Sequence, residues 1–257
     1  MKSIDKILQT LIINGTLTVQ PGLFYGKTGI AVFFFHYARH TGNSLFHEYA
    51  MELIEAIQKQ ITVTTSLRYD TGIAGIGAGF DYFLQNGFIE TDDSDFFSAF
   101  DDRMYRAAMY EPYPDLSLSG GLTGWGRYFI YRLRGNKHKD SRLHEALTHI
   151  ANEIAQCMEE NRVTENEQPD VCRFFSDLAS LPEHAKKYVK DSLPPAPSER
   201  GGGSNVLTEK IRQGWEIWNE TDTSSLANMG LLNGWAAEGM LYLTFFHNLD
   251  KAWLNLL

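Results

Sequence analysis

Four glycine-rich phrases recur along the 257-residue chain, and each begins a stretch with the composition of an apolar helix. They are GLFYGKTGIAVFFF at residues 22–35, DTGIAGIGAGFDYF at 70–83, SGGLTGWGRYFIY at 119–131 and GLLNGWAAEGMLYL at 230–243. Glycine in a helix interior costs roughly 1 kcal/mol relative to alanine, so its concentration at helix starts needs a packing reason. Glycine leaves a flat surface that another backbone or a ligand can approach closely. The repetition predicts one supersecondary unit copied around a common core.

The spacing of the phrases gives the size of this unit. The anchor glycines Gly26, Gly72, Gly121 and Gly234 are separated by 46, 49 and 113 residues. The last interval is slightly more than two of the others, which predicts a further, degenerate unit around residues 171–178. A unit of this length holds two helices and two loops.

Segments with helical hydrophobic spacing lie between the phrases. Apolar residues recur at i, i+3, i+4 and i+7 in residues 46–61, 96–108 and 143–158, and more weakly in 206–218. An acidic helix-start signal at residues 92–95 precedes the second of these segments. Each unit therefore pairs an amphipathic outer helix with a glycine-rich inner helix. The expected fold class is all-α, an (α/α) toroid or incomplete toroid of helical hairpins.

The length and the 43% hydrophobic content favour a single domain over residues 1–257 with one large core. The clearest break is a proline cluster followed by GGGS, which predicts an extended Pro/Gly-rich loop at residues 193–204. That loop is an ordinary connection, an artificial linker or a mobile flap over a site.

The net charge of -9 and the lack of a basic stripe argue against a nucleic-acid partner. The nearest basic cluster, residues 132–139, is expected to be a solvated loop. Such a surface tolerates neutral or cationic partners. Cys157 and Cys172 form no disulfide framework, which favours a reducing compartment. No secretory signal and no membrane span are found in the sequence, so the expected location is cytoplasmic.

Parallel inner helices would gather their N-termini at one mouth, where unpaired N–H groups suit an anion or a peptide carboxylate. The residues just before the anchor glycines should line it, and aromatic side chains nearby could stack on a peptide or a sugar. The expected ligand-binding residues are Tyr25, Asp70, Thr71, Tyr113, Ser119, Trp125, Asn233 and Trp235.

Taken together, the phrases GLFYGKTGIA, TGIAGIG and GLLNGWAA resemble the inner-helix repeats of lanthionine synthetase C-like proteins. This resemblance covers four phrases over most of the chain and implies an (α/α) toroid. It further implies a role in peptide modification or peptide binding, with a peptide or small-molecule ligand and peptide-maturation proteins as partners.

Active members of that family close thioether rings with a zinc ion held by two cysteines and a histidine, from Trp-Cys-x-Gly and Cys-His-Gly phrases before anchor glycines. Here Leu232 and Asn233 precede Gly234, and no cysteine precedes any anchor glycine. Zinc prefers thiolate or imidazole ligands, and these positions supply none. We therefore expect no metal site, and a diverged or non-catalytic protein.

Carboxylates near the predicted mouth give an alternative of another class, a carbohydrate-active (α/α)-toroid hydrolase or epimerase. Asp70, Glu111 and Asp115 are its candidate catalytic residues, since two carboxylates across a cavity can act as acid and base. The competing interpretations are an N-cap for Asp70 and a solvated rigid turn for the other two. A third possibility is a structural interaction module.

Other polar residues favour structural roles. His36 and His40 have the spacing of a ligand pair but lie at a predicted helix end, and His144 and His149 diverge on a helix. Asp81 and Glu238 fall within apolar inner helices and must be paired or functional. A salt bridge to Arg127 or Lys27 is the expected solution.

Overall fold

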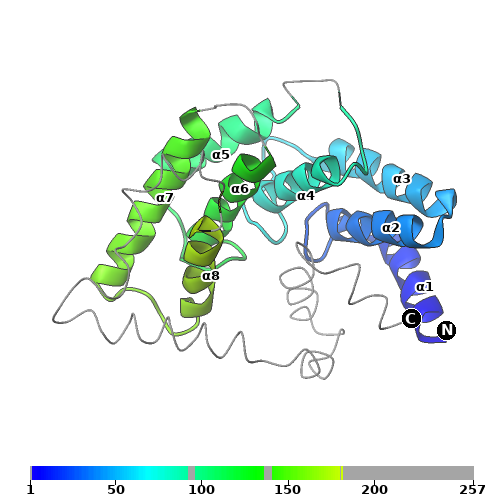
Figure 1. Cartoon of the computed structure of the whole chain (residues 1–257), viewed down its shortest axis with the longest axis horizontal. Coiled ribbons are helices and arrows are strands. Elements are labelled where there is room, and N and C mark those ends of the chain that lie inside the picture. The colour runs from blue at the N-terminus through cyan, green and yellow to red at the C-terminus, as the bar shows by residue number, and fades with distance from the viewer. Residues whose placement is uncertain (1, 92–95, 136–140, 180, 182–257) are drawn as a thin grey trace.

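A computed structural model describes residues 2–91, 96–135, 141–179 and 181 of the chain (Figure 1). Within these residues the protein is all-helical, with eight helices and no strand, which confirms the all-α prediction. The helices are α1 (Lys2–Leu17), α2 (Lys27–Thr41), α3 (Ser44–Gln60), α4 (Ile73–Gln85), α5 (Ser98–Tyr110), α6 (Leu122–Gly135), α7 (Ser141–Glu159) and α8 (Gln168–Ala179).

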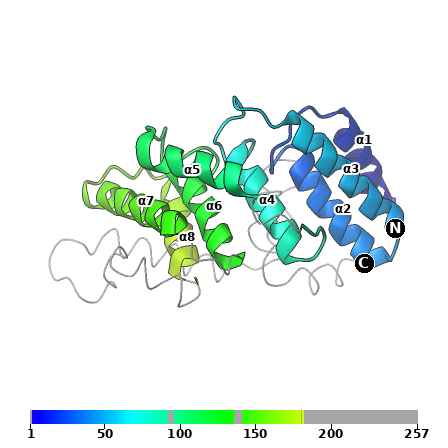
Figure 2. The same cartoon turned by 90° about the horizontal axis from the view of Figure 1, so that it is seen from above.

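The predicted pairing of inner and outer helices is present. α4 packs between α2 and α6, and α6 packs between α4 and α8. The other layer consists of α3, α5 and α7, which pack on α2, α4 and α6, respectively. Figures 1 and 2 show the units following one another from α1–α3 at one end to α7 and α8 at the other. The described helices form a row, and a closed toroid stays a prediction.

The two kinds of helix differ in burial as their sequences predict. Residues 73–83 of α4 are all buried, whereas α3 buries only Ala50, Leu53, Ile54 and Ile57, the i, i+3, i+4, i+7 stripe. The expected helices at 46–61 and 143–158 correspond to α3 and α7. Residues 96–108 correspond to α5, which begins later, at Ser98. The predicted segment 206–218 and the loop 193–204 lie outside the described residues.

Glycines let the inner helices approach their neighbours. A Cβ on Gly126 of α6 would overlap the ring of Phe174 on α8. At Gly77 of α4 it would lie 2.6 Å from the Tyr128 ring of α6. The degenerate unit expected at residues 171–178 is part of α8, which packs on α6 as a fourth inner helix.

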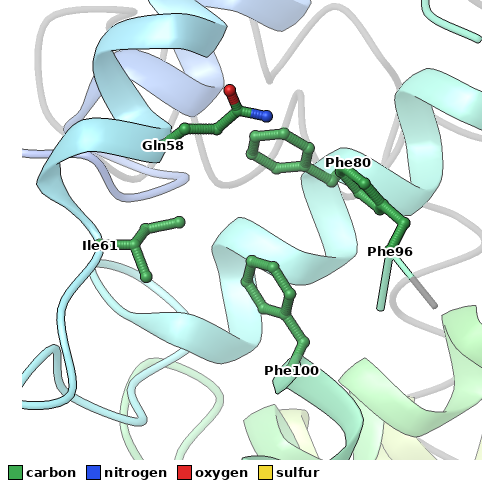
Figure 3. Close-up of a pocket in the computed structure, with 5 residues that line it drawn as sticks. All are labelled: Gln58, Ile61, Phe80, Phe96 and Phe100. Carbon is green, nitrogen blue, oxygen red and sulfur yellow. The ribbon is translucent and has the colours of Figure 1, made fainter. Parts of the chain in front are cut away.

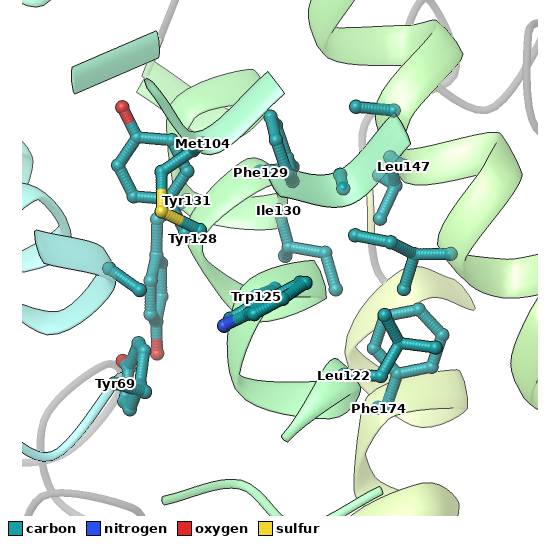
Figure 4. Close-up of a cluster of buried hydrophobic side chains, with 14 of the residues drawn as sticks. Tyr69, Met104, Leu122, Trp125, Tyr128, Phe129, Ile130, Tyr131, Leu147 and Phe174 are labelled. Atoms are coloured by element: carbon teal, nitrogen blue, oxygen red, sulfur yellow. The ribbon is translucent and has the colours of Figure 1, made fainter. Parts of the chain in front are cut away.

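Two hydrophobic clusters fill the space between the layers. One joins α4, α5, α6, α7 and α8 around Trp125, Tyr128 and Phe129 (Figure 4). The other joins α2, α3 and α4 around Phe34, Phe35 and Phe80. Side chains of α4 belong to both clusters, so this helix lies between the two parts of the core.

Arg132 of α6 connects the buried polar groups of this core. Its Nη1 donates to Asp81 Oδ1 of α4 at 2.9 Å, and its Nε and Nη2 donate to Asp101 of α5 at 3.0 and 2.9 Å. Tyr128 donates its hydroxyl to Asp101 Oδ1 at 2.5 Å. Burial raises the pKa of Asp81 to about 6, against the opposing effect of Arg132. We call Asp81, Asp101, Tyr128 and Arg132 the buried ion cluster.

The buried ion cluster corrects two expectations. Asp81 pairs with Arg132 and not with Arg127 or Lys27: Arg127 pairs with Asp177 at 2.9 Å, and Lys27 Nζ donates to the carbonyls of Gly15, at 2.9 Å, and Thr18. The basic stretch at 132–139 is not simply a solvated loop, because Arg132 lies in a helix and is 7% exposed. Glu238 lies outside the described residues.

Candidate functional site

Three loops with the same backbone hydrogen bonding lead into three successive inner helices. The first residue of each helix donates its amide to the carbonyl seven residues earlier: Lys27 to Gln20 at 2.9 Å, Ile73 to Ser66 at 2.8 Å, and Leu122 to Asp115 at 2.9 Å. We call residues 20–26, 66–72 and 115–121 the first, second and third entry loops. Their equal spacing shows that the glycine phrases encode one repeated backbone structure.

A glycine in the first turn of each inner helix lets the entry loop lie against that helix. A Cβ at any of these positions would overlap the carbonyl oxygen six residues earlier, which is main chain and cannot rotate away. The three pairs are Gly29 with Leu23, Gly75 with Tyr69, and Gly124 with Leu118. These close approaches are the packing reason for the repeated glycines.

Main-chain hydrogen bonds join the entry loops at equivalent positions. Phe24 N donates to Asp70 O at 2.9 Å, and Asp70 N donates to Ser119 O at 3.1 Å. These three residues each lie two positions before their anchor glycine. The loops therefore form one continuous edge, which we call the loop row, and the N-termini of α2, α4 and α6 meet there.

Two carboxylates continue the loop row at the start of α8. Glu167 Oε1 accepts from Leu116 N at 2.8 Å, and Asp170 Oδ2 accepts from Leu118 N at 2.7 Å. Burial raises the pKa of Asp170, whereas hydrogen bonds from Thr164 and Leu116 outweigh burial and lower the pKa of Glu167. The fourth inner helix is thus attached by side chains in place of a glycine-rich loop.

The structure brings together four of the expected binding residues on the loop row. Tyr25 is 58% exposed, Thr71 and Ser119 are half-buried, and Asp70 is buried. Asp70 is not the predicted N-cap, because Gly72 holds that position and makes no side-chain capping bond. Its carboxylate instead accepts from Arg68 Nε at 2.8 Å and Nη2 at 2.6 Å.

Arg68 is a residue of the loop row that the sequence analysis did not predict. Its guanidinium pairs with Asp70, and a Cβ on Gly120 would lie 2.6 Å from its Nη1. The side chain therefore spans the second and third loops while staying 49% exposed. The equivalent positions, four residues before the other described anchor glycines, carry Gly22 and Ser117, so no signal in the sequence pointed to an arginine here.

Asp115 begins the third entry loop, whereas Glu111, Tyr113 and Trp125 lie just outside that loop in the sequence. Asp115 is exposed, and its Oδ1 accepts from Ser117 N at 2.8 Å and from Ser117 Oγ at 2.6 Å, an Asx turn. Glu111 is exposed, and the half-buried Tyr113 contacts Cys157 Sγ through its hydroxyl at 3.4 Å. Trp125 is 3% exposed in the core, and its Nε1 has no partner in the described structure. Asn233 and Trp235 lie outside the described residues.

The zinc ion implied by the family resemblance does not fit this edge. The residues directly before the described anchor glycines are Tyr25, Thr71 and Gly120, and none offers a thiolate or imidazole. The nearby Asp70 uses both carboxylate oxygens on Arg68, whose positive charge would repel a cation. Among the described residues no three His, Cys, Asp or Glu side chains converge as a metal site. His36 Nε2 is 2.6 Å from the Tyr82 hydroxyl.

A small hollow lies away from the loop row, between α3, α4 and α5 (Figure 3). Its volume is about 220 Å³, and its lining consists of Gln58, Ile61, Phe80, Phe96 and Phe100. None of these five described lining residues carries a titratable side chain.

No family model, curated protein or solved structure matches this chain. No helix in the part of the chain that the structure describes is long and apolar enough to cross a membrane.

Proposed function

We propose that the protein is a lanthionine synthetase C-like (α/α) protein that binds a peptide along the loop row, without zinc chemistry of its own. The single observation that supports this proposal is the loop row: three glycine-dependent loops are joined main chain to main chain, so their side chains line one edge. A rigid edge lowers the entropic cost of binding an extended ligand.

The side chains of the loop row suit a peptide ligand. Tyr25 offers an exposed aromatic face, and Thr71 and Ser119 offer hydroxyls for hydrogen bonds to a peptide backbone. Arg68 is neutralised by Asp70, whereas Glu111 and Asp115 are exposed and acidic. The rim charge therefore favours a basic or neutral peptide over an acidic one.

No contact in the described structure favours the alternative of a carbohydrate-active enzyme. Asp70 is held by Arg68, and Asp115 Oδ1 accepts the hydrogen bonds of its own turn. Both carboxylates accept hydrogen bonds from residues of their own loops, and so have a structural role there. We therefore place ligand binding, and not hydrolysis, at this edge.

The test is fluorescence anisotropy with three labelled twelve-residue peptides built from Gly, Ser and Leu, carrying four Lys, four Glu or neither. Each titration is carried out both with and without EDTA. The full chain should bind the basic peptide most tightly, and the Tyr25→Ala variant should bind it at least about fivefold more weakly, as expected for loss of an exposed aromatic contact.

Tyr110→Ala is the matched control. Tyr110 is also an exposed tyrosine, at 75%, but it packs edge-on to Tyr105, which donates to Glu145 in the outer layer. This variant should bind like the unmodified chain. Equal losses for the two tyrosines, a preference for the acidic peptide, or binding that EDTA abolishes would each contradict the proposal.

A further inference from the structure

The hollow between the outer helices α3 and α5 takes no part in the loop row. It has a volume of about 220 Å³ (Figure 3). Four of its five lining residues are apolar: Ile61 directly follows α3, Phe80 belongs to α4, Phe100 belongs to α5, and Phe96 lies just before α5. Phe80 is 1% exposed, so the hollow reaches down to the core.

The aromatic wall of the hollow is held by the core beneath it. The Phe80 ring contacts the rings of Phe96 and Phe100, with centroids 5.8 and 6.3 Å apart. Phe100 also lies against α4 at Gly77, where a Cβ would be 3.1 Å from its Cδ1 atom. A side chain at that position would press on the Phe100 ring. The glycine therefore helps to set the position of this wall.

Hydrogen bonds from α5 fix the opposite wall. Arg103 Nη1 donates to the carbonyl of Thr62 at 3.0 Å, and its Nη2 donates to the carbonyl of Thr65. These two bonds attach the segment that follows Ile61 to α5. Both walls are thus held by contacts within the protein, and such preorganisation lowers the entropic cost of binding a ligand.

The size and lining of the hollow indicate the kind of ligand. An apolar cavity of about 150 Å³ can hold benzene, so this hollow has room for one ring or two fused rings. None of the five lining residues is charged, and an unpaired charge in apolar surroundings is costly, so the ligand is neutral. The exposed Gln58 is the one polar lining residue, and its amide can donate or accept a hydrogen bond.

We propose that this hollow is a binding site for a small neutral aromatic molecule of one or two rings, with one polar group that Gln58 recognises. The phenylalanine rings supply apolar and aromatic contacts to the ligand. A free molecule fits better than a protein partner, because a protein interface buries about 800 Å² on each side. A recess of five residues offers far less, and none of its apolar members is among the exposed large hydrophobic residues of the described structure.

Indole is the first probe, and its binding to the full chain is measured by isothermal titration calorimetry. We expect a Kd of about 1 mM or tighter, which is within the affinity available to a ligand of this size. N-acetyl-tryptophanamide carries the same ring on a peptide unit and should bind at least about tenfold more weakly. No binding of indole at millimolar concentrations overturns the proposal. Equal or tighter binding of the amide also overturns it and assigns the hollow to a protein side chain.

Ile61→Phe places a ring in the hollow and tests its location. Ile61 is half-buried at the end of α3, and the larger side chain should occupy the space of the ligand and weaken indole binding at least about tenfold. Leu45→Phe is the matched control at the other end of α3, where Leu45 is 65% exposed, and it should bind indole like the unmodified chain. Equal affinities of the two variants would place the indole site elsewhere.

Gln58→Leu tests the polar contact at an exposed position. It should weaken indole binding by about threefold to tenfold, the range of one hydrogen bond, and leave the binding of benzofuran unchanged, since benzofuran has nearly the same shape but no N–H. Equal changes for the two ligands contradict recognition by Gln58. None of these measurements uses the labelled peptides or Tyr25→Ala, so failure here is distinguishable from failure of the proposed function.

Discussion

At the scale of single residues, the buried ion cluster shows how strongly this core depends on one cation. Arg132 pairs with two aspartates from two other helices, and its guanidinium carbon lies 3.8 Å from the centre of the Phe97 ring. Two carboxylates and one guanidinium leave one excess negative charge in a region where charge is expensive. The two aspartates differ: Asp101 accepts three hydrogen bonds within the cluster, whereas burial raises the pKa of Asp81.

Asp101→Asn should be strongly destabilising. Asp101 accepts three hydrogen bonds, from Tyr128 and from two guanidinium nitrogens of Arg132. Breaking a buried ion pair of this kind costs about 3–5 kcal/mol in the free energy of unfolding, measurable by urea denaturation. The neighbouring Asp102→Asn is the control, since its bridge to Arg142 is half exposed and contributes about 1 kcal/mol or less. Similar losses in the free energy of unfolding for the two variants would contradict a large contribution from the buried Asp101–Arg132 pair.

Asp81 should make the stability of the protein depend on pH. Its pKa is raised to about 6 by burial, so the folded state binds this proton more tightly than the unfolded state, where the pKa is near 3.8. The free energy of unfolding attributable to Asp81 therefore rises as pH falls from above 6 toward 4, by roughly 2–3 kcal/mol. In Asp81→Asn this contribution is absent, and its stability at pH 7.5 should equal or exceed that of the unmodified chain.

Urea denaturation at pH 7.5, 6 and 5 checks this expectation. Other titrating groups are common to both proteins, so the difference between the two pH profiles isolates Asp81. Parallel profiles would show that Asp81 titrates in its ordinary range.

Residue pairings were the least predictable part of the structure. The sequence places Asp81 in an apolar helix and so predicts a partner, but that partner lies 51 positions away on α6. Asp70 before a predicted helix start suggests a cap, yet the helix begins after Gly72 and Arg68 takes the carboxylate. Hydrophobic periodicity does not specify which cation reaches a given anion.

At the scale of elements, periodicity and glycine were reliable guides. The stripes at 46–61 and 143–158 correspond to α3 and α7 because burial on one face sets both the pattern and the helix. The three glycine phrases that the structure describes correspond to entry loops plus inner helices, since their spacing preserves a seven-residue backbone closure. The start of α5 was less certain because Phe97 precedes it without a side-chain cap.

Gly75→Ala should destabilise the protein although alanine is the better helix former. The added methyl would overlap the carbonyl oxygen of Tyr69, and relief requires moving the second entry loop off α4. We expect a loss of about 2–3 kcal/mol in the free energy of unfolding, as for an overpacked core.

Gly42→Ala is the comparison for this prediction. Gly42 has a φ of 68°, and a Cβ there would meet no atom within 4 Å. Its loss should be about 1 kcal/mol, from backbone strain alone. Thermal or urea denaturation of both variants decides the order, and a smaller loss for Gly75→Ala would contradict the close approach.

At the scale of the whole molecule, the repeat predicts the alternation of layers but not how far it continues. Each unit contacts its immediate neighbours, α2 with α4, α4 with α6 and α6 with α8. Local spacing therefore determines each contact between successive inner helices. The curvature that would make a ring accumulates over all units. The position of the candidate edge was predictable from the entry loops, but the role of Arg68 was not.

The joints between entry loops use only backbone atoms, and this has an evolutionary consequence. A phenylalanine, an aspartate and a serine occupy the same joint position in successive loops without changing the connection. Natural selection can thus exchange rim side chains freely, provided the glycines beneath them are kept. A scaffold of this kind can lose one chemistry and acquire another recognition surface while its architecture is inherited intact.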